Sequence, residues 1–323
     1  MKRIFLILLI FFFSGHFLYA QPELQKPGDT GRMTITVNPV KPDTTTLKKN
    51  KKLNSGKPEQ KVPTKLQRPL DTNQAKALQL YNLGNLKVKQ KDYEGAIADY
   101  TRSLALFENG NAYVRRGYTY LALQNFDSAV ADAKSGLKLL PFNAQAHLIL
   151  GVISFERGDY ENAEKSLTQS VKFDKKNPLT YNYLAALRYL KKDYLGAYLY
   201  YDSVARLNPN FPDVYTNRGM MNHYLNKYKE AIDDFGMAIK ADSNDANAYN
   251  NRGATELASK DFQASLDDLN KAISLKAEYP NAFFNRGKVK HLMGDLEGAC
   301  ADWKIALSYG EKTAEELIKK FCQ

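Results

Sequence analysis

Three residue types that could take part in binding recur together at a fixed interval near the C-terminal end of the chain. Asparagine, arginine and glycine stand side by side at residues 217–219, 251–253 and 285–287, 34 residues apart each time. An asparagine side chain both donates and accepts hydrogen bonds, so amides in a row suit the binding of a peptide backbone. A buried arginine needs an acidic partner. The interval therefore raises the question of which of these residues bind a ligand and which hold the fold together.

The glycines of these triplets belong to a longer series of markers, which are Gly84, Gly117, Gly151, Ala185, Gly219, Gly253 and Gly287. A second small residue follows each marker by 12 positions, and an aromatic residue stands three places before it in six of the seven units. Small residues at these two places let a pair of antiparallel helices approach closely, while the rings fill the space toward the next pair. The pattern predicts seven helical hairpins.

This period, with its small residues and rings, resembles the tetratricopeptide repeat, a helix-turn-helix unit of 34 residues. The resemblance implies an all-α fold, a right-handed α-solenoid of seven such repeats over residues 74–311, closed by a C-terminal capping helix over residues 312–323. The chain departs from the family in two ways. The usual tryptophan is replaced by Tyr, His, Phe or Leu, and the leucine before the marker survives only as Leu83, Leu150 and Leu184.

In the other four units an arginine replaces that leucine, and an aspartate stands 16 residues after the arginine. Of the three leucine units, only one keeps an acid at the equivalent place. This covariation favours an ion pair between the two helices of a hairpin over a role in ligand binding, because a desolvated charge needs a partner. The predicted structural pairs are Arg116 with Asp132, Arg218 with Asp234, Arg252 with Asp268 and Arg286 with Asp302.

The resemblance also implies a binding surface, because the first helix of each unit in this family lines a concave groove, into which the residue two before the marker points. Asparagine holds that place in the last three units, and such a ladder can bind an extended chain whatever its sequence. An alternative stays open, in which asparagine is only tolerated on an exposed helix face. The candidate groove residues are Asn82, Tyr118, Asn217, His223, Tyr224, Asn250, Asn251, Phe284 and Asn285.

Rings at neighbouring groove places, among them Tyr189 and His291, add to this surface. Aromatic residues presented together with amides suit the recognition of protein segments, and they fit a glycan less specifically. Packing of some rings between units is the alternative, which the sequence does not decide.

The two cysteines of the chain lie close to its C-terminal end. Residues 312–322 have the periodicity of an amphipathic helix, as expected for the cap that an open solenoid needs over its last apolar face. In an oxidising compartment we expect a disulfide between Cys300 and Cys322 to fix this cap. Two buried free thiols are the alternative, and no cluster of His or Cys accompanies them to indicate a metal site.

The N-terminal segment differs in composition from the repeats. Residues 1–20 combine Lys2 and Arg3 with an apolar run and a small residue at Ala20, the pattern of a secretory signal peptide, with an uncleaved anchor as the alternative. Residues 21–73 are rich in Pro, Thr and Lys and predict a disordered basic tether. We therefore expect export to the periplasm or the extracellular space, and the lack of any glycosylation sequon favours a bacterial periplasm.

The formal net charge of +11 resides mostly outside the repeats. Eleven basic and five acidic residues lie in the tether, and residues 74–323 carry only +3. The basic pI is therefore weak support for nucleic-acid binding, and we expect none. Contact of the tether with an anionic envelope surface is an alternative to a solvated spacer.

Residues typical of catalysis are not arranged in any known motif. The chain has no phosphate-binding glycine loop or nucleophile elbow, and its four histidines lie far apart in the sequence. We expect no enzymatic activity, no cofactor, no metal and no small-molecule substrate. The sequence instead predicts an interaction scaffold that binds a protein or peptide in its concave groove. The alternative is a structural assembly subunit of an envelope complex that uses its convex face or its ends.

Overall fold

The computed structural model describes residues 71–322 with the exception of residue 212. The predicted signal peptide and nearly all of the predicted tether lie outside the described residues. The described part divides into two units, residues 71–175 and 176–322, which are considered separately. No helix within the described part is both long and apolar enough to cross a membrane.

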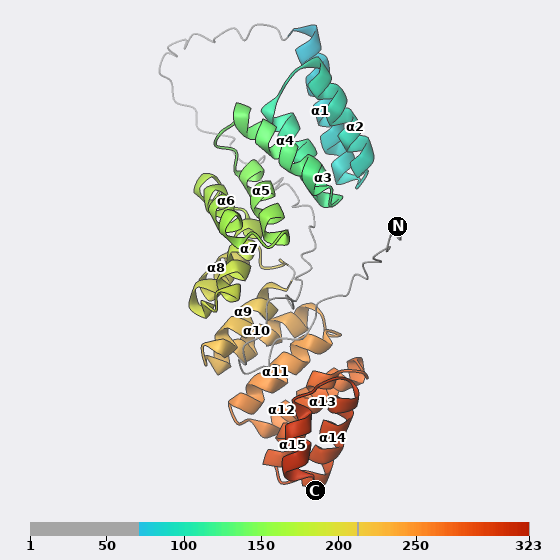
Figure 1. The fold of residues 1–323 in the computed structure, drawn as a ribbon, viewed down its shortest axis with the longest axis vertical. Helices are drawn as coiled ribbons and strands as arrows, with labels where there is room; N and C mark the ends of the chain where they lie inside the picture. The colour runs from blue at the N-terminus through green and yellow to red at the C-terminus, as the bar shows by residue number, and fades with distance from the viewer. Residues whose placement is uncertain (1–70, 212, 323) are drawn as a thin grey trace, which may run out of the picture. The chain divides into compact units, whose positions relative to one another are not determined.

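Every regular element in the described residues is an α-helix, as predicted (Figure 1). The first unit holds α1 (Thr72–Lys89), α2 (Tyr93–Leu106), α3 (Gly110–Ala122), α4 (Phe126–Leu139), α5 (Ala144–Glu156) and α6 (Tyr160–Phe173). The second unit holds α7 (Pro178–Leu190), α8 (Tyr194–Leu207), α9 (Val214–Tyr224), α10 (Tyr228–Ala241), α11 (Ala246–Ala258), α12 (Phe262–Leu275), α13 (Pro280–Leu292), α14 (Leu296–Ser308) and α15 (Ala314–Phe321). The expected tether ended at residue 73, but α1 already begins at Thr72.

Each odd-numbered helix from α1 to α13 packs against the next helix and forms one hairpin with it. The marker glycines lie where the two helices of a hairpin approach most closely. At Gly287, for example, an added Cβ atom would stand 2.5 Å from Nε1 of Trp303, closer than packed atoms can come. The small marker therefore has the structural role that its spacing predicted.

The turn inside each of the seven hairpins has one residue with a positive φ, seven places after the marker. Glycine tolerates this conformation and asparagine is the next best, yet only three of the turns use them. The residues are Lys91, Gln124, Gly158, Lys192, Asn226, Lys260 and Gly294. In six of the turns the next residue is Asp or Asn, whose side chain accepts a hydrogen bond from the backbone of the second helix and caps it.

The remaining turn, between α9 and α10, has Lys227 at the capping place, and its side chain makes no cap hydrogen bond. We expect Lys227→Asp to raise the free energy of unfolding of the second unit by about 1 kcal/mol, because it restores the cap found in the sister turns. Urea denaturation measures the change. Lys227→Gln is the control, because it removes the same charge without supplying a good cap. An equal gain from both variants would contradict the capping explanation.

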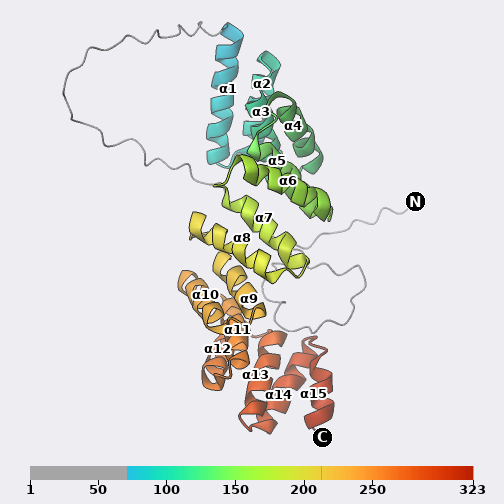
Figure 2. The ribbon, with the colours of Figure 1, turned by 90° about the vertical axis from the view of Figure 1, so that its left-hand side faces the viewer.

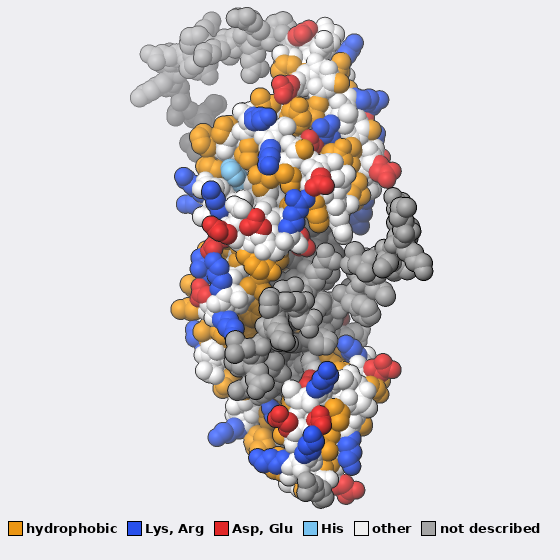
Figure 3. Space-filling view, in the orientation of Figure 1, with side chains coloured by type: hydrophobic (Ala, Val, Ile, Leu, Met, Phe, Trp, Pro, Cys, Tyr) orange, Lys and Arg blue, Asp and Glu red, His pale blue; other side chains and the backbone are white. Residues whose placement is uncertain are grey.

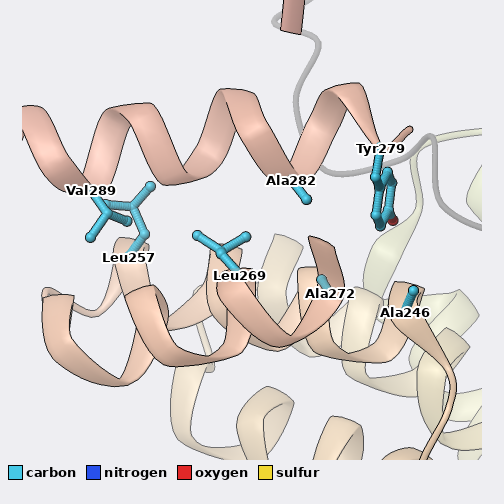
Figure 4. Packing of buried hydrophobic residues seen from close by; sticks show 7 residues of the cluster. All are labelled: Ala246, Leu257, Leu269, Ala272, Tyr279, Ala282 and Val289. Carbon is cyan, nitrogen blue, oxygen red and sulfur yellow. The ribbon is translucent and has the colours of Figure 1, made fainter. Parts of the chain in front are cut away.

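The core of the second unit runs between successive hairpins. Ala246 and Leu257 on α11, Leu269 and Ala272 on α12, and Val289 on α13 form one buried cluster (Figure 4). Tyr279, at the start of α13, completes it and donates its hydroxyl hydrogen to Asn247 Oδ1 at 2.8 Å. Successive first helices also contact one another, α9 with α11 and α11 with α13 in this unit, and α1 with α3 and α3 with α5 in the other. Helices α1, α3 and α5 in one unit, and α9, α11 and α13 in the other, therefore each form a continuous face.

Helix α15 packs on α14, and the Cys300–Cys322 disulfide joins the two. Beneath the cap, Trp303 and Phe284 belong to an apolar cluster that Leu317 and Phe321 help to cover. His291 contacts this cluster too, since its ring centroid lies 4.4 Å from that of Phe321. For His291 the packing alternative therefore holds, because the ring lies against Phe321 of the cap.

Candidate binding face and the ion pairs behind it

The structure brings together all four predicted arginine–aspartate pairs, each between the two helices of one hairpin. In all four, two guanidinium nitrogens meet the two carboxylate oxygens in a bidentate contact, as in Arg252 Nε to Asp268 Oδ2 at 2.6 Å and Nη2 to Oδ1 at 2.9 Å. Arg116 and Arg286 pair with Asp132 and Asp302 in the same way, at 2.7–2.8 Å. In the fourth pair, Arg218 Nε lies 3.1 Å from Asp234 Oδ2 and Nη2 lies 2.6 Å from Oδ1. Since the aspartates are buried, these pairs hold charges that folding has largely desolvated.

Each arginine also stacks on the aromatic residue three places before it, with guanidinium-to-ring distances between 5.2 and 5.8 Å. Three of the arginines extend a further nitrogen to the second helix of the preceding hairpin. Arg218 Nη1 bonds Asp202 at 3.0 Å, and Arg286 Nη1 bonds Asn270 at 2.8 Å. Arg116 bonds Thr101 in the same way. Each of these three arginines therefore links three helices, which are its own, the second helix of its hairpin and the second helix of the preceding hairpin.

Sequence reasoning missed the residue four places after the arginine, which faces the same aspartate. Lys290 Nζ lies 2.9 Å from Asp302 Oδ2, and Asn222 donates to Asp234 Oδ2 at 3.0 Å. In the leucine unit that keeps its acid, Lys87 Nζ lies 2.7 Å from Asp99 Oδ2 and replaces the missing arginine. A lysine four places after Leu83 was the signal in the sequence that explains why Asp99 is retained.

Glu256 holds this place in the sixth repeat and puts a second carboxylate beside Asp268. Its Oε1 lies 3.9 Å from Arg252 Nε, while its Oε2 is buried with no hydrogen-bond partner among the described residues. Burial, and then the nearby Asp268, raise the pKa of Glu256 to about 8. The folded protein therefore keeps a proton on Glu256 that the unfolded chain releases above its ordinary value of 4.5.

This raised pKa makes the second unit less stable as the pH rises from about 4.5 to about 8, because the folded state binds the extra proton in that window. We expect Glu256→Gln to be more stable than the natural chain by about 2 kcal/mol at pH 8 and by much less at pH 5. Urea denaturation at both pH values measures the difference. Glu230→Gln, on the exposed surface of α10, is the control that should show no such trend. A gain that is the same at both pH values would refute the assignment.

Of the candidate groove residues, the structure links three asparagines of the second unit directly. Asn285 on α13 donates from Nδ2 to Asn250 Oδ1 at 3.2 Å, and Asn250 donates to Asn251 Oδ1 at 3.3 Å. All three side chains are buried. Asn285 Oδ1 has no hydrogen-bond partner among the described residues, which leaves one amide acceptor of this face open. The lateral contact thus runs from Asn285 to Asn250, and Asn217 on α9 bonds to neither.

Rings flank the amides on α9. His223 Nδ1 lies 3.0 Å from Thr255 Oγ1 on α11, and burial lowers the pKa of His223 to about 4, so that the imidazole is neutral at pH 7. Tyr224 stacks on Tyr194 with ring centroids 4.5 Å apart, and burial raises its pKa. On α13, Lys288 Nζ lies 5.6 Å from the ring centroid of Phe284. This face therefore combines neutral amides and rings with a single lysine.

Two candidate residues, Asn82 and Tyr118, lie on α1 and α3, and so in the first unit rather than with the other seven. Asn82 is exposed, and Tyr118 is half-buried with a pKa raised by that burial. Within residues 71–322, no three His, Cys, Asp or Glu side chains gather as a metal site would require. Figure 3 shows Lys, Arg, Asp and Glu side chains mixed over the visible surface, without a large field of one sign.

Comparison with known proteins agrees with the hairpin geometry. The sequence model of the family described as tetratricopeptide repeat matches residues 81–133, 114–178 and 224–283. The small glutamine-rich tetratricopeptide repeat-containing protein 2 of Mycosarcoma maydis is 34% identical over 119 residues, which are 36% of this chain and 34% of that protein. The chain spans between 19% and 38% of the length of the curated relatives that it matches first. Residues 81–178 and 224–283 of this chain therefore match the tetratricopeptide repeat family, whose members generally mediate protein–protein interactions.

Two solved structures share the fold at low sequence identity. YrrB, described as a tetratricopeptide repeat protein with an unusual peptide-binding site, is 19% identical with a TM-score of 0.53, over 57% of this chain and 95% of that chain. A chain of the Cut9–Hcn1 hetero-tetramer of APC/C is 18% identical, also with a TM-score of 0.53, over 66% of this chain and 42% of that chain. At this level of identity the likeness is one of fold.

Proposed function

We propose that this chain is a non-enzymatic scaffold that binds an extended protein or peptide segment along the face of α9, α11 and α13. The observation that carries the proposal is the buried amide cluster of Asn250, Asn251 and Asn285, in which Asn285 Oδ1 lacks a partner. An unpaired buried acceptor costs about 1–3 kcal/mol, which a donor from a bound backbone would recover on displacing the side chains that cover Asn285 Oδ1. The peptide-binding site ascribed to YrrB supports the same class of ligand.

The rings beside the amide cluster suit side chains of such a segment. His223 and Tyr224 present apolar surface with hydrogen-bonding edges, whereas Phe284 on α13 is buried in the apolar cluster beneath the cap. Aromatic residues in this setting commonly supply most of the binding energy. Since the amides recognise backbone and carry no charge, we infer a ligand chosen mainly by its extended shape and by one or two apolar side chains.

We propose that this binding takes place in the cell envelope, after export through residues 1–20 and with residues 21–73 as the tether. A pull-down from envelope extract tests the proposal, with the mature chain beside a variant that carries alanine at Asn217, Asn251 and Asn285. Alanine at the exposed Asn111, Asn210 and Asn244 is the matched control. We expect one partner to be lost with the first variant only.

Circular dichroism of both variants must first show an intact fold, because the amide cluster is buried. A partner retained equally by all three proteins would refute binding at this face. That result would favour the alternative role, a structural assembly subunit that uses its other surfaces.

A further inference from the structure

The outer side of α1 lacks a neighbour that five other first helices have. Within the two units, α3, α5, α9, α11 and α13 each pack on the second helix of the preceding hairpin. Helix α1 contacts only α2 and α3 among the described helices and lies at the edge of its unit (Figure 2). The repeats that contain those five helices therefore bury both sides of the first helix, whereas the first repeat leaves one side of α1 uncovered.

Equivalent residues show how large this difference is. Leu86 is 50% exposed, whereas the residues at its place in sister repeats are 0–2% exposed. These residues are Thr119, Ile153, Met221, Thr255 and Val289. Leu83 is 46% exposed and stands where the four arginines stand in their own repeats, three of which bond the preceding second helix. Leu78 is 47% exposed. These three leucines lie on the uncovered side of α1 together with the exposed Gln79 and Asn82, and this side is here called the α1 stripe.

The charges around the α1 stripe select what can cover it. Helix α1 contains Lys76, Lys87 and Lys89 and no acidic residue. With 3.6 residues per turn, the exposed Lys76 and Lys89 flank the stripe on opposite edges. Lys87 is already paired with Asp99. An occupant with acidic residues at its margins would meet the two free lysines, and a basic one would be repelled.

Coverage by a second copy of this chain, or by its own N-terminal segment, fits these charges poorly. Two α1 stripes facing each other would bring Lys76 and Lys89 of both copies together. Residues 21–73 carry eleven basic against five acidic residues. The far end of the second unit is closed by α15, whose outer side exposes Glu315, Glu316 and Lys319 rather than an apolar surface.

We propose that the α1 stripe binds an acidic amphipathic helix of a partner protein, in the place that a preceding second helix would occupy. The partner helix presents apolar side chains to Leu78, Leu83 and Leu86 and carboxylates to Lys76 and Lys89. This surface lies in the first unit and is separate from the face of α9, α11 and α13. The chain therefore has two independent binding surfaces.

The test uses a defined peptide with the sequence of α10 (residues 228–241), which covers α11 in the same relation, with both of its lysines replaced by glutamate and a side-chain staple to keep it helical. We expect saturable binding by fluorescence anisotropy to the full chain, weakened at least tenfold by Leu83→Asp with Leu86→Asp. The matched control is Leu195→Asp with Leu199→Asp, two leucines of α8 that are 53% and 56% exposed. That variant should bind as the natural chain does.

Charge is tested separately from apolar contact. A version of the peptide with its acidic residues replaced by lysine should bind at least tenfold more weakly, and Lys76→Glu with Lys89→Glu should reverse that preference. No saturable binding by the natural chain, or equal binding by the Leu83/Leu86 variant and its control, would overturn the proposal. So would a dimer in sedimentation that the Leu83/Leu86 variant loses, or a tenfold gain in affinity on deletion of residues 21–66. The dimer would identify a second copy as the occupant of the α1 stripe. The gain in affinity on deletion would identify the chain's own N-terminal segment as the occupant.

Discussion

Replacement of Asp302 by asparagine is expected to lower the free energy of unfolding of the second unit by about 3 kcal/mol. Asp302 is 2% exposed and is the acid that faces both Arg286 and Lys290. Asparagine keeps the shape of the side chain, so packing changes little, but two partly buried cations then face each other without a counter-charge. Desolvated charges left without a partner are among the costliest single defects in a folded protein.

Asp268→Asn in the preceding repeat is the matched comparison, and it should cost about half as much or less. When Asp268 loses its charge, Glu256 stands close enough to Arg252 to ionise and take its place. Urea denaturation of the two variants, side by side, measures the difference. Equal losses would show that the residue four places after the arginine does not determine how much stability the aspartate contributes. Replacing Arg286, Lys290 and Asp302 together with apolar residues should recover most of the lost stability, because no charge then remains buried.

Removal of the disulfide is the second change expected to have a large effect. Replacing Cys300 and Cys322 with serine should lower the free energy of unfolding of the second unit by about 3 kcal/mol, the value for a loop of this length. The loss should begin at α15, since this short helix has few other contacts to hold it and covers the apolar cluster around Trp303.

Trp303 makes the release of the cap directly measurable. It is the one tryptophan of the chain, is 1% exposed, and lies 6.1 Å from the ring of Phe321 on α15. We expect its fluorescence to shift to longer wavelength and to become open to acrylamide quenching in the serine variant at denaturant concentrations that leave the natural chain unchanged. Reduction of the natural chain should reproduce the effect. Identical quenching before and after reduction would contradict a role for the bond in holding the cap.

Local repetition allowed most of the hairpin architecture to be predicted from the sequence. A period of 33 or 34 residues, with two small residues in each unit and a ring between them in six of the seven, is enough to predict paired helices. Each position of the repeat reports its own packing environment seven times over. The same redundancy exposed the arginine–aspartate pairs. Arginine and aspartate appear together within one unit, and the structure places each such pair in contact.

Contacts between units were beyond sequence reasoning. The sequence predicted a ladder of Asn217, Asn251 and Asn285, but the structure joins Asn285 to Asn250 and leaves Asn217 aside. The offset between neighbouring first helices depends on how whole hairpins pack. His291 shares its place in the repeat with His223, yet it lies under α15, since only the last repeat is followed by a cap. The uncovered side of α1 was likewise not predictable from the repeat pattern, because α1 belongs to the first repeat, where the periodicity stops.

The sequence by itself determined the helical class, the seven hairpins, their close-approach glycines and the partners of four half-buried arginines. Each of these follows from residues within one repeat, where short chain separation limits the possible contacts. Only the tertiary structure decided which amides meet across helices, which carboxylate lacks a partner, and which side of α1 stays uncovered. These features depend on how one hairpin packs against the next. That packing is determined by all the side chains of both contacting surfaces and not by any single position of the repeat.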